Sequence, residues 1–244
     1  MSLFSAITGK KQSKGGQLLE RLGGAERLED RREAIAEFKD LTSRQPVRLV
    51  FEGGIGVLLN LLRGEDTDTH RDALETLVNL LDRDVPKEQP EAAQVAATHN
   101  CGVLLSHPEK IGVILGAAEN SDMYVRYHAT QLLMRLLSVA AARTQEAMLE
   151  QPATVAAVVK LLEDKREIVR NEVLLLLAQL SAHNASLQTI LAFQGAFDQL
   201  IKIIEGELQS GESGAAAVVN DCFAIVSSLL SRRALRDRGS SVAA

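Results

Sequence analysis

Tryptophan is absent from this chain of 244 residues, and aromatic residues of all kinds make up only 3% of it. The bases of a single-stranded nucleic acid therefore find no row of aromatic rings on which to stack. The only two cysteines, Cys101 and Cys222, are too few for a disulfide framework, so we expect a reducing compartment. No apolar run reaches the 18 residues of a membrane-spanning helix, and the residues after Met1 do not resemble a secretory signal. Neither a membrane span nor secretion is expected.

Acidic residues outnumber basic ones by 32 to 27, and the formal net charge is −5. Residues 1–16 and residues 232–244 each carry +3, which leaves −11 for residues 17–231. Nucleic-acid binding needs basic charge against phosphate, so no nucleic-acid partner is expected. We predict a repeat domain over 17–231, with a flexible basic N-terminus over 1–16 and a disordered basic tail over 232–244.

An apolar pattern recurs along the chain at offsets 0, +4 and +7, which place three side chains on one stripe of a helix. The intervals between successive first members are 39, 56, 44 and 49 residues. The five sets are Ala34, Phe38 and Leu41; Ala73, Leu77 and Leu80; Ala129, Leu133 and Leu136; Val173, Leu177 and Leu180; and Cys222, Val226 and Leu229.

A second series of four apolar blocks alternates with the first, beginning at Gly53, Glu109, Ala153 and Gly195. The blocks start 56, 44 and 42 residues apart, so both series report one insertion. That insertion covers about residues 82–100 and is polar with two prolines, Pro86 and Pro90, which predicts a loop.

Periods near 42 residues without strand signals are typical of armadillo and HEAT repeats. We predict an all-α, right-handed α-solenoid with about four helix pairs and the first helix of a fifth. Asp30 with Glu33, and Asp164 with Glu167, are candidate helix starts, and Gly53 and Gly195 are candidate turns. Because the tail after Leu230 has too few apolar positions for another helix, we expect this chain to be the N-terminal part of a longer solenoid or a truncated form of one.

Few residues suggest chemistry. His99, Cys101 and His107 form an H-x-C-x5-H cluster, which falls short of the four closely spaced ligands that zinc needs. Cys222 occupies a repeat position and is expected to be buried and inert. Residues 53–56 read GGIG but lack the Lys-Ser/Thr of a phosphate-binding loop. We therefore predict no catalytic, cofactor-binding or metal-binding residues, no cofactor and no enzymatic activity.

Three features could serve binding instead. Arg126 and Arg170 occupy equivalent repeat positions, with Asp122 and Glu167 one turn earlier, which indicates surface ion pairs in preference to a partner-facing ridge. Asn60 and Asn79 could contact a peptide, although the tryptophans that accompany asparagine in nuclear-import adaptors are missing. At the N-terminus, Leu3, Phe4 and Ile7 precede three lysines and could touch an anionic membrane surface, so peripheral membrane association is an open expectation.

Four segments resemble the head domain of the general vesicular transport factor family, and the resemblance spreads from about residue 28 to 230. They are DRREA at 30–34, LLEDKREIVRNE at 161–172, ILAFQGAFDQLI at 190–201 and VNDC at 219–222. The repeat order and the polar insertion agree with it as well.

The resemblance implies a long, dimeric cytosolic tether that acts without chemistry. Members of that family carry an armadillo head, a coiled coil and an acidic tail, and they capture vesicles on the route from the endoplasmic reticulum to the Golgi and within the Golgi before SNARE-mediated fusion. It implies Rab-type GTPases, golgins and SNAREs as partners, and a cytoplasmic location at the surface of Golgi and transport membranes. No heptad run or acidic tail is present here, so functions of those parts are not carried over, and no contact residue is mapped. The alternative is a generic armadillo scaffold that grips a peptide or regulatory partner in its concave groove.

Overall fold

The computed structural model describes residues 13–45, 52–84, 90–107, 109–210 and 214–231, and all regular structure in these ranges is helical. The chain forms two compact units, residues 1–103 and residues 104–244, which are described separately. The first unit contains α2 (Lys14–Gly24), α3 (Leu28–Arg44), α4 (Glu52–Leu61), α5 (Thr67–Leu80) and α6 (Pro90–Leu104) up to its last residue. The second contains α7 (Glu109–Ala118), α8 (Met123–Leu149), α9 (Pro152–Lys160), the 3₁₀ turn η1 (Leu161–Glu163), α10 (Glu167–Ser181), α11 (Ala185–Phe193), α12 (Ala196–Ser210) and α13 (Ala215–Leu229).

In the first unit, α3 packs against α2 on one side and α5 on the other, and α4 packs against α2 and α5. Ala34, Phe38, Ala73 and Leu77 are fully buried where α3 meets α5. A second link between these helices is ionic, because Lys39 Nζ bonds to Asp72 Oδ1 at 2.6 Å. The apolar stripe predicted for these two helices is therefore the surface along which they pack.

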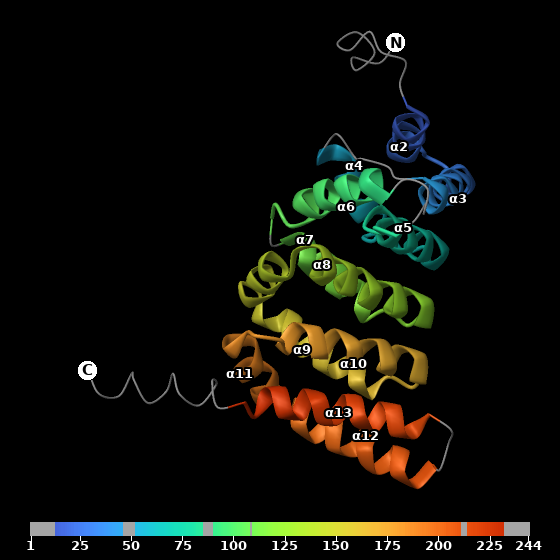
Figure 1. Cartoon of the computed structure of the whole chain (residues 1–244). Helices are drawn as coiled ribbons and strands as arrows, with labels where there is room; N and C mark the ends of the chain where they lie inside the picture. The colour runs from blue at the N-terminus through green and yellow to red at the C-terminus, as the bar shows by residue number, and fades with distance from the viewer. Residues whose placement is uncertain (1–12, 46–51, 85–89, 108, 211–213, 232–244) are drawn as a thin grey trace. The chain divides into compact units, whose positions relative to one another are not determined.

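In the second unit, α8, α10 and α13 lie side by side in successive layers, and α10 contacts both neighbours (Figure 1). The helices of the second apolar series pack behind them, α7 against α8 and α12 against α13. Of the fifteen residues in the first series, all but Leu41 and Val226 are buried. The prediction of an all-α solenoid fold is confirmed.

One predicted loop is wrong in its second half. Residues 90–100, assigned to the polar insertion, belong to α6, while residues 85–89 lie outside the described residues. Pro90 stands at the first position of the helix, where its missing N–H costs nothing. Four alanines between Glu91 and Ala97 favour helix, because alanine has the highest intrinsic helix propensity.

A further helix follows three of the leading helices in the described residues, and the sequence pattern did not predict it. In chain order α6 follows α5, and α11 follows α10. In α8 the backbone leaves helical geometry at Ala140 (φ −148°, ψ 66°), so that residues 141–149 form a separate short helix. Buried amide side chains on these further helices bond to carbonyls at the ends of the leading helices. The bonds are Asn100 Nδ2 to Leu80 O at 3.0 Å, Gln145 Nε2 to Leu180 O at 3.2 Å, and Gln188 Nε2 to Ser181 O at 2.9 Å.

The helix ends differ in part from those predicted. Asp30 lies inside the first turn of α3, and the residues that cap α3 and α10 are Arg27 and Arg166, neither with a side-chain cap bond. Side-chain caps come from Asp66, Asp122 and Asn184 instead. Gly53 lies within α4, so the turn predicted there is wrong, whereas Gly195 makes the predicted turn before α12 with φ +83°. Helix α2 begins at Lys14, inside the segment predicted to be flexible, and residues 1–12 and 232–244 lie outside the described residues. The single repeat domain over 17–231 stays a prediction.

Candidate interaction surface

A basic side chain near the start of four leading helices reaches back to the loop before its own helix. Each stands three residues before the first member of its apolar set and donates to the carbonyl oxygen six residues earlier. The bonds are Arg31 Nη2 to Ala25 O at 3.1 Å, His70 Nε2 to Gly64 O at 2.9 Å, Arg126 Nη1 to Asn120 O at 2.9 Å and Arg170 Nη1 to Asp164 O at 2.9 Å. The same repeat position thus fixes the loop in both units.

Arg126 also joins two leading helices of the second unit. Its Nε and Nη2 donate to the two carboxylate oxygens of Asp164 at 2.5 and 3.0 Å. Both side chains are mostly buried, with 15% of Arg126 and 4% of Asp164 exposed. The surface ion pair predicted for Arg126 is therefore an interior bridge to the loop before α10, while Asp122 caps α8 by accepting from Tyr124 N and Val125 N.

The Arg126 guanidinium changes the acidity of Asp164. Burial by itself raises the pKa of this carboxyl, but hydrogen bonds from Arg126 and from the Arg166 backbone N–H outweigh burial. The pKa of Asp164 therefore lies below its ordinary value of 3.8. The Asp164 side chain therefore stays an anion at physiological pH and keeps its two hydrogen bonds with the Arg126 guanidinium.

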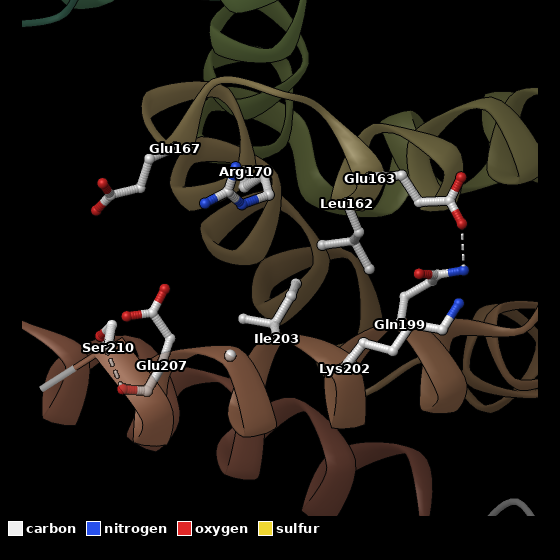
Figure 2. Close-up of a pocket in the computed structure, with 10 residues that line it drawn as sticks. Leu162, Glu163, Glu167, Arg170, Gln199, Lys202, Ile203, Glu207 and Ser210 are labelled. Carbon is white, nitrogen blue, oxygen red and sulfur yellow. Dashed lines mark hydrogen bonds between the residues drawn. The ribbon is translucent and has the colours of Figure 1, made fainter.

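Arg170 repeats the clamp of Arg126 but not its carboxylate pair. Among the described residues, no carboxylate bonds to its guanidinium. Figure 2 shows the guanidinium directed into a groove between the start of α10 and α12, with the Glu207 carboxylate pointing toward it from α12. The groove has a volume of about 530 Å³, within the range of 300–1,000 Å³ typical of ligand pockets.

The charges of this groove are divided between its ends. Glu167 and Glu207 lie toward one end, Lys202 and Glu163 lie toward the other, and Arg170 lies between them (Figure 2). Gln199 Nε2 donates to Glu163 Oε1 at 2.5 Å and so links α12 to η1. The remaining lining residues, Leu162, Ile203, Gly206 and Ser210, supply an apolar floor and one hydroxyl. The groove therefore suits a partner that carries both signs of charge.

A second polar cluster lies between α8 and α10. Gln131 Nε2 donates to Tyr127 Oη at 2.8 Å, and Tyr127 also bonds to the carboxylate of Glu172. Burial raises the pKa of Glu172 above its ordinary 4.5, against the opposing effect of hydrogen bonds from Tyr127 and Gln131. Burial, together with the negative charge of Glu172, raises the pKa of Tyr127. The buried carboxyl of Glu172 is therefore harder to ionise than an exposed one.

Several apolar side chains of the second unit are exposed. Tyr124 and Ile168, at equivalent positions on α8 and α10, are each 50% exposed. Ile201 on α12 and Phe223 on α13 are about half exposed, whereas their counterparts one repeat earlier, Val159 and Leu174, are buried. These side chains are available for contact with another protein surface.

The residues that the sequence singled out do not gather into a chemical site. His99 and the buried Cys101 lie on α6, and His107 is an exposed residue two positions before α7. The described residues contain no group of three or more His, Cys, Asp or Glu side chains arranged to hold a metal ion. Burial, with help from nearby carboxylates, raises the pKa of the Cys222 thiol to about 11, as expected for an inert core thiol.

The two asparagines considered for peptide binding differ in their surroundings. Asn60 is exposed in the last turn of α4. Asn79 instead bonds to α3, through its Nδ2 to Lys39 O at 3.5 Å and to Thr42 Oγ1 at 3.4 Å.

The groove around Arg170 was not predicted from the sequence, because its lining residues come from three elements, η1, α10 and α12. The sequence showed only that Arg126 and Arg170 occupy equivalent repeat positions.

Known proteins resemble the chain over most of its length, although no protein-family model matches it. Golgin candidate 6 from Arabidopsis thaliana is 35% identical over 212 residues, which is 85% of this chain. General vesicular transport factor p115 from Bos taurus is 30% identical over 224 residues, or 88% of this chain. This chain is a homologue of the general vesicular transport factors.

The homology covers one part of those proteins. The chain spans 23% of the length of golgin candidate 6 and 22% of that of p115. The crystal structure of Uso1-2 matches 94% of this chain, and the match covers 36% of the Uso1-2 chain. The TM-score is 0.73 and the identity 21%, which shows a shared fold. None of the described helices is both long and apolar enough to cross a membrane.

Proposed function

We propose that this chain acts as the head region of a vesicle tethering factor, without enzymatic chemistry. In this function it helps to dock transport vesicles before SNARE-mediated fusion, on the route from the endoplasmic reticulum to the Golgi and within the Golgi. The observation that carries the proposal is the similarity over 85–88% of the chain to proteins named as a golgin candidate and as vesicular transport factors in plant and mammal. The yeast relative, 25% identical, is named as an intracellular protein transport protein.

The architecture supports binding in preference to catalysis. Stacked helices present side chains along a broad surface, on which many weak contacts can add to a specific interface. The second unit offers one polar groove and several half-exposed apolar residues on this surface. A tether that binds a vesicle raises the effective concentration of the fusion proteins at the target membrane.

The proposal includes protein partners and a location. Rab-type GTPases, golgins and SNAREs are the partner classes, a parent protein with further segments would be a homodimer, and the location is cytoplasmic, at the periphery of Golgi and transport membranes. No nucleic acid and no cofactor takes part. The excess of acidic charge over residues 17–231 is compatible with a protein partner and unfavourable for nucleic acid.

A cell-free assay of transport from the endoplasmic reticulum to the Golgi tests this function. Purified chain added in excess should compete for the docking partners and leave released vesicles free in the supernatant, with a dose-dependent loss of cargo delivery. Heat-denatured chain at the same concentration is the control. Normal delivery and normal vesicle attachment at saturating chain would contradict the proposal.

The second candidate is a scaffold that holds a peptide or regulatory partner in a groove, unrelated to vesicles. The groove around Arg170 favours it, because a cavity of about 530 Å³ is wide enough for several side chains. Proximity labelling in cells separates the two functions. Labelled Golgi and vesicle proteins support the tether, and a set of partners without them supports the scaffold.

A further inference from the structure

We infer that Arg170 receives a carboxylate from a protein partner, presented by an extended segment in which an acidic residue stands next to a basic one. This inference rests on the proposed function as a protein-binding surface and names the chemistry that the surface recognises. Two arginines at the same repeat position, Arg126 and Arg170, differ in what their guanidinium groups bind.

Arg126 shows how an arginine at this repeat position binds a carboxylate. One nitrogen of its guanidinium holds the loop carbonyl of Asn120, and the opposite edge grips both oxygens of Asp164. A planar guanidinium matches a carboxylate in this two-bonded arrangement, which adds direction as well as strength.

The guanidinium of Arg170 is held by a loop carbonyl in the same way, but its other edge has no carboxylate bound to it among the described residues. Its Nη1 is held by the carbonyl of Asp164, so the side chain is oriented before any partner arrives. The edge that corresponds to the paired edge of Arg126 faces the groove, and no described carboxylate bonds to it. An orientation fixed in advance lowers the conformational entropy lost on binding.

The surrounding charges define the partner further. Lys202 adds a second cation toward one end of the groove, beside Glu163, whose carboxylate accepts a hydrogen bond from Gln199. Glu167 and Glu207, at the other end, would repel a run of acidic residues and attract a lysine or arginine next to the carboxylate. Ile203 lies between them and can contact an apolar side chain. Charge complementarity therefore favours a basic residue next to the acidic one, and the apolar side chains of Leu162 and Ile203 favour an apolar neighbour, as in a Lys-Asp-Leu segment.

Side-chain NMR of the 244-residue chain tests the inference with defined peptides. The probe is acetyl-Ser-Lys-Asp-Leu-Ser-amide, and its twin carries Asn in place of Asp. The Asp peptide should shift the Arg170 Nε–Hε signal saturably and bind at least roughly tenfold more tightly than the Asn twin. The variant R170Q should bind the Asp peptide at least roughly tenfold more weakly than the unchanged chain. R170K should show most of the same loss, because lysine keeps the charge but cannot make two parallel hydrogen bonds to a carboxylate.

The matched control is K165Q, which removes one positive charge from an exposed residue outside the groove. Its affinity should stay within about twofold of that of the unchanged chain, and circular dichroism checks that each variant is folded. Equal losses in K165Q and R170Q would show non-specific charge attraction and overturn the inference. So would equal binding of the two peptides, or no shift at about 10 mM peptide.

The chain itself could supply the carboxylate, from Glu207 or from Glu212, which lies outside the described residues. In that case the Nε–Hε signal of Arg170, measured without peptide, would differ between the unchanged chain and E207Q or E212Q, because the variant would have lost the carboxylate bound to Arg170. Such a difference would show that the inference is wrong. Because these measurements use peptides without vesicles, they can fail while the transport assay succeeds, and the reverse.

Discussion

Arg126 on α8 and Asp164 in the loop before α10 form a two-bonded ion pair, although 38 residues separate them in the sequence. Removing one member of a buried pair leaves the other charge without compensation, which costs about 3 kcal/mol or more. We therefore expect R126A to lower the free energy of unfolding by about 3 kcal/mol in urea denaturation. The exposed Arg166 provides the control, since R166A should change stability by no more than about 0.5 kcal/mol. A loss as small in R126A as in R166A would contradict the assigned pair.

The same pair predicts a dependence of stability on acid. Because the pKa of Asp164 is lower in the folded chain than its ordinary 3.8, ionised Asp164 stabilises the fold. This stabilisation is fully present above pH 3.8 and is lost as the pH falls through the lower, folded pKa. The difference in free energy of unfolding between the unchanged chain and D164N should therefore be largest near neutral pH and shrink below about pH 4. A difference that stays constant down to pH 2 would count against the shift.

The leading helices were predictable because their burial follows a period that the sequence shows directly. Ala129, Leu133 and Leu136 are all fully buried, and apolar spacing alone identified them. The further helices after α5, α8 and α10 were not, because polar side chains are buried among their apolar ones. Asn100 and Gln188 interrupt the apolar stripe and are buried because they bond to the carbonyls at the ends of other helices.

The candidate groove was less predictable still, for a related reason. Repeat equivalence placed Arg126 and Arg170 at the same position, but it favoured pairing with neighbours one turn earlier on the same helix. The real partner of Arg126 comes from the loop of the next repeat, a contact that depends on how helices stack. The period of apolar residues within a helix can be found in the local sequence, but the distance between side chains on different elements cannot.

Two glycines of the second unit should respond in opposite directions to alanine. Gly195 has φ +83°, a left-handed backbone conformation that costs an L-residue about 1–2 kcal/mol, so G195A should destabilise the fold by about 1 kcal/mol. Gly116 lies inside α7, and a new Cβ there would have nothing within 4 Å. Alanine reduces the freedom of the unfolded chain, so G116A should stabilise the fold by roughly 0.5–1 kcal/mol. Thermal unfolding of both variants measures the difference, and equal signs would contradict these backbone assignments.

Glu172 should be a position where a neutral side chain is better than the native charge. Burial raises the pKa of Glu172 in the folded chain above 4.5, so ionisation is harder there than in the unfolded chain. For an acid with a raised pKa, stability falls as the pH rises from the unfolded to the folded value, and the full cost remains at neutral pH. Glutamine keeps an oxygen that can accept the bond from Tyr127, without the charge. We expect E172Q to gain up to about 0.5 kcal/mol at pH 7 and to lose that advantage below pH 4.5, where Glu172 is protonated in both states. Urea denaturation at the two pH values measures this, and a variant less stable than the unchanged chain at pH 7 would show that the carboxylate supports the cluster.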